Sequence, residues 1–444
     1  MKEIFDQFLK TLAQTERLPA RALALYQQDL LIRLVRHAHT ALPFYRDRLA
    51  CLFAPNGEVD LSRWNEVPLL TRDDVAARGA EMRVLDLAAE YGEIAEARTS
   101  GSTGVPLDIA TNGMVYFCAS ALFTRTARRF GMDTSRPLAT IGRYRHRPIP
   151  PYPEGAVSSG WSMSDPDTPA YRLELTTPVD QQLEWLSRRK APYLRTQPSG
   201  ALAIAHAVTP DDGRALGIET VLLNGENVPD GAREIIAERL GARAAAFYSC
   251  QEIGHIASEC EAAPHYHVAA ENALVEIVDD RGRDVAPGER GRVIVTGLYN
   301  YVMPFIRYEL GDVAVAGAGD CPCGRTLPVI ARVEGRSRNA FVFRDGSRMW
   351  PRTSMVRAMH PFVPFVRFQL IQLDFERIEF RYLPDGSGRT PDVAGLNAHA
   401  RRVFHTSVEI DPVEVDALVP GPSGKFEEFV SRVPAARAAG PIDR

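Results

Sequence analysis

Residues 218–250 read IETVLLNGENVPDGAREIIAERLGARAAAFYSC, and this stretch decides the fold class. Two short apolar runs, IETVLLNGE (218–226) and ARAAAFYSC (242–250), flank the helical pattern DGAREIIAERLG (230–241). Strands that alternate with helices are typical of an α/β core. We therefore expect an α/β fold, with further α+β elements elsewhere in the chain.

The rest of the 444-residue chain divides around this core. The first 85 residues predict a helical cap, because ALALYQQDLLIRLVRHAHTAL (22–42) has apolar residues at a spacing of three to four. The segment 272–298 has two β-rich runs separated by Asp, Gly and Pro, which predicts a long hairpin or strands of a small barrel-like sheet. The pattern changes after VEGRSRN (333–339), so we expect a large domain at 1–335 and a small one at 336–444.

Charge and composition favour a small-molecule partner. The net charge of −4 does not indicate the basic surface that binds nucleic acid or an anionic membrane. The amino terminus has no apolar signal region, and no later run is apolar enough to span a bilayer. Six cysteines are too few for a disulfide scaffold. These features predict a cytoplasmic protein in a reducing compartment.

The loop RTSGSTGVP (98–106) has the composition of a phosphate-binding loop but lacks the lysine of a Walker motif. Its small residues let backbone N–H groups converge on an anion, and its hydroxyls add donors. A flexible Gly/Ser turn is the alternative. The candidate phosphate-binding residues are Thr99, Ser100, Gly101, Ser102, Thr103 and Gly104.

A lysine is unusual in this chain, whose basic residues are almost all arginine. The four lysines are Lys2, Lys10, Lys190 and Lys425. A compact ammonium on a flexible stem does chemistry that a planar guanidinium does not. Lys425, in PSGKFEEF, is the candidate for such a role, whereas the other three lie in surface-like helical patterns.

Cysteines and histidines form a second candidate site. CPCG (321–324) is a tight turn with two thiolates, and a short loop earlier in the chain offers more N and S donors of the kind that tetrahedral zinc prefers. Buried free cysteines are the alternative. The predicted structural zinc ligands are Cys260, His267, Cys321 and Cys323, with His265 or Cys250 in reserve.

Further motifs follow the loop in order: NGENVP (224–229), FYSCQEIG (247–254), MPFIRYELGD (303–312), VEGR (333–336) and PSGK (422–425). In order, composition and separation they resemble the adenylate-forming enzymes, and within them the phenylacetate-CoA ligase group and its CapK-like relatives. The resemblance runs from LVRHAHTALPFYRDRL (34–49) to the final SGK. Relatives of this group carry a similar Cys-His and Cys-x-Cys pattern.

The resemblance implies roles for matching residues. The loop 99–104 would hold the ATP phosphates, Tyr248 would stack near adenine, and Glu252 would help bind Mg²⁺. Asp312 and Arg336 would bind the ribose hydroxyls. The alternatives are that Asp312 is a turn former and that Arg336 forms a surface ion pair. Lys425 would bridge the reacting carboxylate and the α-phosphate. The remaining implied ATP-binding residues are Gly225, Glu226 and Ser249.

The chemistry gives a reason for these residue types. A carboxylate that attacks an α-phosphate brings two anions together, so Mg²⁺ and an ammonium must neutralise charge in the transition state. The resemblance implies that an acyl-adenylate forms with release of pyrophosphate. The acyl group, from an aryl or related acid, would then pass to CoA as a small mobile carboxy-terminal domain rotates.

Other interpretations stay open. An amine, a hydroxyl or a carrier-protein thiol can replace CoA as acceptor, and a non-catalytic zinc- and nucleotide-binding protein is a further alternative. A homodimer is the default oligomeric state.

Three departures from the family pattern affect this interpretation. Val105 stands where many members have lysine, and Arg338 stands where many have a hinge aspartate. The third departure is a basic cluster where phenylacetate-type ligases have a glycine-rich stretch. This cluster is either a solvated surface or a contact to an acidic substrate or to CoA phosphates, and it consists of Arg143, Arg145, His146 and Arg147.

Overall fold

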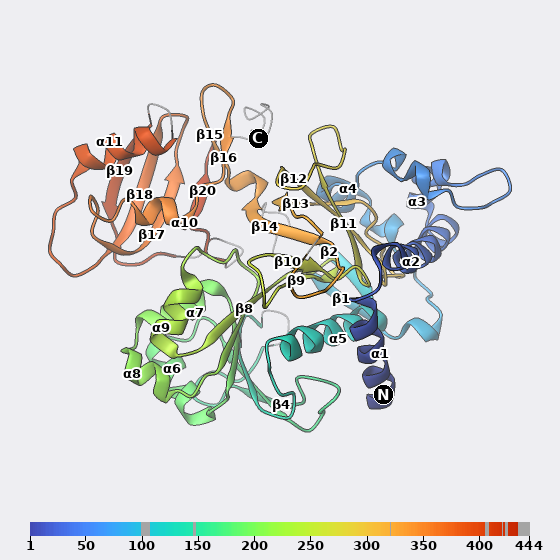
Figure 1. Ribbon diagram of the computed structural model, residues 1–444, viewed down its shortest axis with the longest axis horizontal. Helices are drawn as coiled ribbons and strands as arrows, with labels where there is room; N and C mark the ends of the chain where they lie inside the picture. Colours follow the sequence, from blue (N-terminus) through green and yellow to red (C-terminus); the bar gives the residue numbers. More distant parts are fainter. Residues whose placement is uncertain are drawn as a thin grey trace.

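The computed structural model describes residues 1–98, 107–144, 148–319, 321–404, 408–419, 421 and 425–433. Helices and short 3-10 turns fill the amino-terminal segment, as the sequence predicts. Figure 1 shows these helices, in blue, on the side of the molecule away from the small carboxy-terminal domain. The segment contains α1 (Lys2–Thr15), α2 (Ala20–Ala41), α3 (Pro43–Arg48), η1 (Ala50–Leu52), η2 (Leu61–Glu66), α4 (Arg72–Arg78), η3 (Gly79–Met82) and η4 (Ala89–Tyr91).

A continuous sheet of twelve strands runs through the described part of the large domain. Its first six strands pair antiparallel, and so do β9 and β8. In spatial order the strands are β11 (Ala273–Val278), β12 (Arg290–Gly297), β13 (Tyr308–Ala316), β14 (Val329–Arg336), β10 (Tyr266–Val268), β9 (Gly254–Glu259), β8 (Arg243–Cys250), β7 (Thr220–Leu223), β6 (Tyr193–Thr196), β3 (Leu138–Gly142), β5 (Pro169–Glu174) and β4 (Ala156–Ser159).

The stretch 218–250 forms the predicted strand, helix and strand. β7 and β8 pair in parallel, and α9 (Ala232–Leu240) connects them. Left-handed glycines bound this helix, Gly231 at φ 78° and Gly241 at φ 66°, so its ends need residues without a Cβ. The predicted hairpin at 272–298 is also present, as the antiparallel pair β11 and β12.

Parallel strands β5, β3, β6, β7 and β8 form the α/β half of the large domain. Their hydrophobic core includes the fully buried Trp185 and the apolar faces of the helices that cover the sheet. Figure 1 shows this half in green, beside the small domain. Its helices are α5 (Gly113–Arg129), α6 (Val179–Arg189), α7 (Pro198–His206), α8 (Pro210–Ala215) and α9. A separate two-stranded sheet pairs β1 (Ile94–Arg98) with β2 (Asp108–Asn112).

The small carboxy-terminal domain has an α+β architecture with its own hydrophobic core, which extends from Phe341 to Ile410. The predicted fold class is thus confirmed, whereas the exact boundary after residue 335 stays a prediction. The elements of this domain are β15 (Phe341–Val342), β16 (Arg348–Met349), α10 (Thr353–Arg357), β17 (Phe365–Gln372), β18 (Arg377–Pro384), α11 (Val393–Phe404), β19 (Glu409–Glu414) and β20 (Phe429–Ser431), preceded by η5 (Ser337–Asn339).

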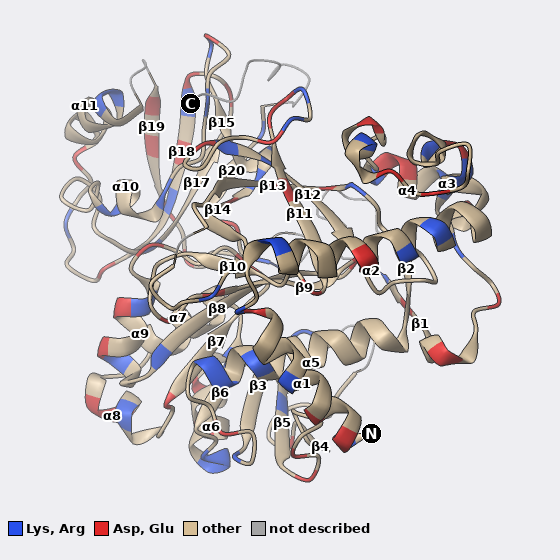
Figure 2. Cartoon of the chain, turned by 45° about the vertical axis from the view of Figure 1, so that its right-hand side comes forward, with Lys and Arg blue, Asp and Glu red and all other residues tan. Residues whose placement is uncertain are grey.

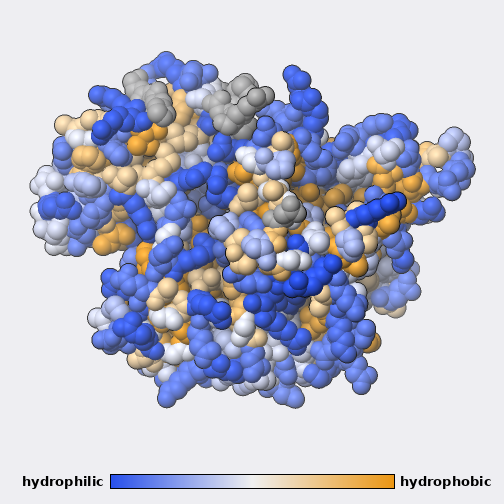
Figure 3. Space-filling model, viewed as in Figure 1, coloured by the Kyte–Doolittle hydropathy of each residue, from blue (hydrophilic) through white to orange (hydrophobic). Residues whose placement is uncertain are grey.

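Charges of both signs lie on the described surface of the protein. Basic and acidic residues lie intermixed on α8 and α9 (Figure 2), and polar residues cover most of the face in Figure 3. Within the described ranges, none of the helices combines the length and the apolar character that crossing a membrane requires.

Candidate active site

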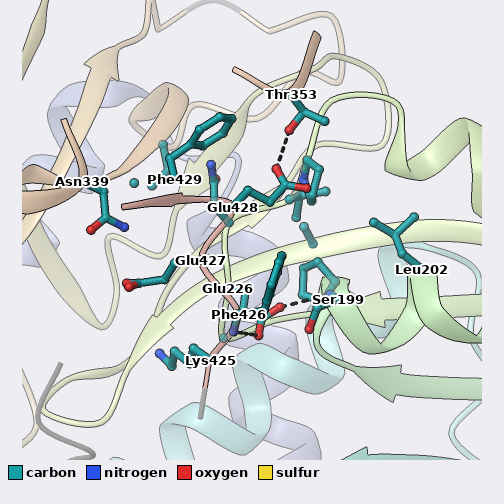
Figure 4. A pocket seen from close by; sticks show the side chains of 18 of the residues that line it. Ser199, Leu202, Glu226, Asn339, Thr353, Lys425, Phe426, Glu427, Glu428 and Phe429 are labelled. Atoms are coloured by element: carbon teal, nitrogen blue, oxygen red, sulfur yellow. Dashed lines mark hydrogen bonds between the residues drawn. The ribbon is translucent and has the colours of Figure 1, made fainter. Parts of the chain in front are cut away.

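A cavity of about 240 Å³ lies between the large and small domains. Residues of β8, β13, β14 and the loop after β7 line one side, and residues of the small domain line the other. Figure 4 shows Glu226 from the loop after β7 beside Lys425 and Phe426. Seven of the predicted site residues line this one cavity: Gly225, Glu226, Tyr248, Ser249, Asp312, Arg336 and Lys425.

Strand register brings Asp312 and Arg336 together. They are paired residues of β13 and β14, and Arg336 Nε lies 3.1 Å from Asp312 Oδ1. The register then shifts, because Val313 pairs with Gly335 and Ala314 with Val333. Such a bulge redirects the side chains beside it. The carboxylate of Asp312 therefore faces the cavity with a charged partner already in place.

Tyr248 completes this group from β8. Its hydroxyl donates to Asp312 Oδ2 at 2.5 Å, and burial raises the pKa of Tyr248 well above its ordinary value. The charge of Asp312 raises the pKa of Arg336. A carboxylate has about four acceptor positions, so Asp312 still has the capacity to accept from vicinal hydroxyls.

Glu226 connects the two domains across the cavity. Its Oε2 accepts from the backbone N–H of Ser199 at 3.0 Å, and its Oε1 accepts from that of Phe426 at 2.9 Å (Figure 4). Phe426 follows Lys425 directly, so this contact fixes the backbone that carries the lysine. Burial raises the pKa of Glu226.

Lys425 is half-buried among charges of both signs. Burial, and then the neighbouring Arg336, lower the pKa of its ammonium. Asp312, Glu226 and Glu252 oppose this change. Glu252 does not line the cavity, but it is 7% exposed and its charge acts on both Lys425 and Arg336.

Arg338, at the position predicted as the hinge, also contacts the lysine segment. Arg338 Nη2 lies 2.6 Å from Glu427 Oε1, two residues after Lys425. An arginine where many relatives have aspartate thus has a carboxylate partner in the small domain. The predicted phosphate loop 99–104, Val105 and the basic residues Arg145, His146 and Arg147 lie outside the described residues.

The cysteines and histidines form a cluster away from the cavity. Donor atoms of Cys260, His265, His267 and Cys321 all lie within 4.8 Å of one another. Cys323 joins them, since its Sγ lies 3.3 Å from His267 Nε2. The structure thus brings together the four predicted ligands and one of the two reserves. β10 supplies His267, and the turn between β13 and β14 supplies Cys321 and Cys323.

Cys250 does not belong to this cluster, and its place among the reserve ligands is therefore wrong. Cys250 pairs with Gly254 at the start of β9, whereas Cys260 follows the end of that strand. A six-residue strand separates the two positions by roughly 20 Å. Burial and the nearby Glu252 instead raise the pKa of the Cys250 thiol.

Comparisons with known proteins agree with this geometry. No family model matches the chain. A phenylacetate-coenzyme A ligase from Thermus thermophilus is 26% identical over 358 residues, which cover 76% of this chain and 75% of the relative. The predicted resemblance is confirmed.

Solved structures of acyl-CoA ligases share the fold. A 2-hydroxyisobutyryl-CoA ligase in the postadenylation state, in complex with R3-HIB-AMP, matches with a TM-score of 0.75 and 16% identity. The match covers 96% of this chain and 92% of the ligase. The same ligase in the thioesterification state, with 2-HIB-AMP and CoA, gives a TM-score of 0.62 and 17% identity over 96% of this chain and 93% of the ligase.

Several cavity residues carry no signal in the sequence motifs. Ser199 donates its backbone N–H to Glu226, and Glu428 accepts from Thr353 Oγ1 at 2.6 Å inside the small domain. Burial raises the pKa of Glu428 to about 7. A Glu-Glu pair one residue after the PSGK motif is the only sequence signal for Glu428, and such a pair is ordinary on a surface.

Proposed function

We propose that this chain is an AMP-forming carboxylic acid:CoA ligase that acts on an aryl or related acid. The first half-reaction joins the acid to the α-phosphate of ATP and releases pyrophosphate. The second transfers the acyl group to the CoA thiol and releases AMP. The observation that carries this proposal is the cavity itself, where Tyr248 of β8, Asp312 of β13 and Arg336 of β14 line the same space as Lys425.

Each residue has a task that its contacts support. Asp312 accepts from the ribose hydroxyls while Arg336 and Tyr248 hold its carboxylate in place. The ring of Tyr248 packs along the adenine. Lys425 places its ammonium between the acid and the α-phosphate, where negative charge develops as the new P–O bond forms. The loop 99–104 lies outside the described residues, and its composition alone supports the task of supplying N–H and hydroxyl donors to the phosphates.

The arrangement of the domains fits the first half-reaction. Glu226 holds the backbone of Phe426, and Arg338 holds Glu427, so both contacts keep Lys425 at the cavity. The TM-score is also higher against the postadenylation state than against the thioesterification state of the same ligase. The second half-reaction then requires these two contacts to break as the small domain rotates.

Glu252 is the residue that would hold Mg²⁺. Its carboxylate is buried and close enough to act on the charge of Lys425, so an acidic group stands beside the cavity. When bound, the ion neutralises phosphate charge and polarises the α-phosphate. A cytoplasmic location and a homodimer stay predictions from the sequence.

The test is ATP–pyrophosphate exchange against a panel of aromatic, aliphatic and amino-substituted acids. At least one acid is expected to support exchange, and CoA is then expected to convert the acid into a thioester with release of AMP. Exchange without thioester formation would indicate that the acyl acceptor is an amine, a hydroxyl or a carrier-protein thiol and not CoA. Failure of every acid to support exchange would contradict the proposal.

We also propose that the Cys and His cluster holds one structural zinc ion. His265 Nε2 is buried and has no hydrogen-bond partner within the described part of the chain, as expected of a nitrogen that faces a metal. Three thiols and two imidazoles exceed the four donors that tetrahedral zinc takes. Zinc there would join the loop after β9 to the turn that leads into β14, the strand of Arg336.

Metal analysis of the purified protein is expected to give about one zinc per chain. Cys260→Ser is expected to lose most of this zinc and to lower the melting temperature, because a structural metal contributes folding free energy. Cys51→Ser is the matched control, since Cys51 is a free cysteine outside the cluster. Comparison of His265→Ala with Cys323→Ser identifies the fourth ligand. A zinc content near zero in the wild type would contradict the assignment.

A further inference from the structure

The order in which the chain adds parallel strands to the sheet reverses between β3 and β6. From β3 the sheet continues to β5 on one side and to β6, β7 and β8 on the other. In open α/β sheets, ligands bind beyond the carboxyl ends of the strands at such a switch point. Arg195 pairs with Thr140 across this point and lies one residue before the end of β6.

Two aromatic rings and one amide hold the Arg195 guanidinium. Its central carbon lies 5.0 Å from the ring centre of Phe123 on α5 and 5.2 Å from that of Phe247 on β8. Its Nε donates to Asn224 Oδ1 at 3.2 Å. Stacking on these rings fixes the plane of the cation, and among the described residues no hydrogen bond engages its Nη atoms.

Two of these partners, Asn224 and Phe247, are sequence neighbours of residues that line the cavity. Asn224 immediately precedes Gly225 and Glu226, and Phe247 immediately precedes Tyr248. Phe247, Gly225, Glu226 and Tyr248 all line the cavity. Arg195 therefore contacts Phe247, a residue of the cavity wall, and Asn224, which precedes two others.

The charge of Arg195 has no carboxylate partner among the residues that the structure describes. Tyr144 and a second cation, Arg172, act on its charge. The nearby Glu174 accepts instead from the backbone N–H of Tyr144 at 3.1 Å. Arg195 is half-buried, and burial and then Arg172 lower its pKa, so its charged neighbour is a second cation. A cation in such a place calls for an anion from outside the chain.

We infer that Arg195 is a specificity-determining residue that binds a second carboxylate on the acid substrate, so the preferred acids are dicarboxylic. The inference rests on the proposed function, because it names the acid that the adenylation site activates. A guanidinium fork matches a carboxylate in shape and can bind it with two parallel N–H bonds. Phe123 and Phe247 also provide apolar surface for the carbon skeleton between the two carboxylates.

The test measures pyrophosphate exchange with matched pairs of acids on the full-length chain. The pairs are benzoate with isophthalate, phenylacetate with its meta-carboxy derivative, and pentanoate with glutarate. For at least one pair, the wild type is expected to prefer the dicarboxylate in kcat/KM by about 10- to 100-fold, the range for a hydrogen-bonded charge. Arg195→Leu is expected to remove this preference, and Arg195→Lys to retain part of it.

Arg189→Leu is the matched control. Arg189 also lies over two aromatic rings, Tyr171 at 5.1 Å and Trp185 at 5.7 Å, but on α6 away from the cavity. This variant is expected to keep the wild-type ranking of acids. If Arg195→Leu does not fold, the preference of the wild type for dicarboxylic over monocarboxylic acids still tests the inference.

The outcomes separate the inference from the proposed function. Exchange that favours monocarboxylates in every pair, with a ranking unchanged by Arg195→Leu, overturns the inference and leaves the ligase activity standing. A change confined to the KM for CoA also overturns it, since Arg195 would then contact the thiol substrate. No exchange with any acid overturns the proposed function and, with it, the inference.

Discussion

Replacing Lys425 by alanine is expected to lower the rate of acyl-adenylate formation by about 100- to 1,000-fold, the usual effect of removing one preorganised electrostatic group. The ammonium lies in a cavity whose nearby charges include Asp312, Glu226 and Glu252. Without it, the acid and the α-phosphate approach each other with less neutralising charge. Pyrophosphate exchange with the preferred acid measures this step alone.

The second half-reaction is expected to respond differently. Thioester formation from a chemically prepared acyl-adenylate should proceed in Lys425→Ala within a few-fold of the wild-type rate, because the small domain has then moved Lys425 away. Lys10→Ala is the matched control, since Lys10 is exposed on α1. Wild-type exchange in Lys425→Ala with loss of thioester formation would reverse the assigned role.

Much of the fold and cavity followed from the sequence, because the relevant signals are local or carry distinctive chemistry. The alternation around α9 predicted β7 and β8, and turn residues predicted the hairpin of β11 and β12. Motif resemblance selected Asp312 and Arg336 although no spacing rule pairs them. The register of β13 and β14 provides the physical reason, because it sets the two residues opposite each other.

Other parts depend on contacts between distant segments and have no local signature. Ser199 meets Glu226 only in the folded chain, and any residue type in its place would offer the same backbone N–H, so the sequence does not reveal this contact. Arg195 acquires its surroundings from α5, β6, β8 and the loop after β7, which meet only in the folded chain. The reserve ligand Cys250 was wrong for the same reason, since strand β9 carries it away from Cys260. A one-dimensional spacing cannot show which end of a strand a side chain occupies.

Replacing Arg307 by alanine is expected to lower the free energy of unfolding by about 3 to 5 kcal/mol, the cost of breaking a buried ion pair. Arg307 is 2% exposed, and its Nη2 lies 2.9 Å from Glu276 Oε1. Its Nη1 also donates to the carbonyl of Val67 at 2.8 Å and to that of Asn65 at 3.1 Å. One side chain therefore connects the amino-terminal helical segment to β11.

The substitution leaves Glu276 as a buried carboxylate whose remaining side-chain partner is Trp64, whose Nε1 donates to it at 3.1 Å. Burial already raises the pKa of Glu276, and removal of the cation would raise it further. Chemical denaturation measures the loss, with Arg63→Ala as the exposed-pair control expected to change nothing measurable. The double variant Arg307→Met with Glu276→Leu should recover most of the stability, because the uncompensated charge is gone. A single Arg307→Ala variant as stable as the wild type would show that the helical segment is held by apolar packing alone.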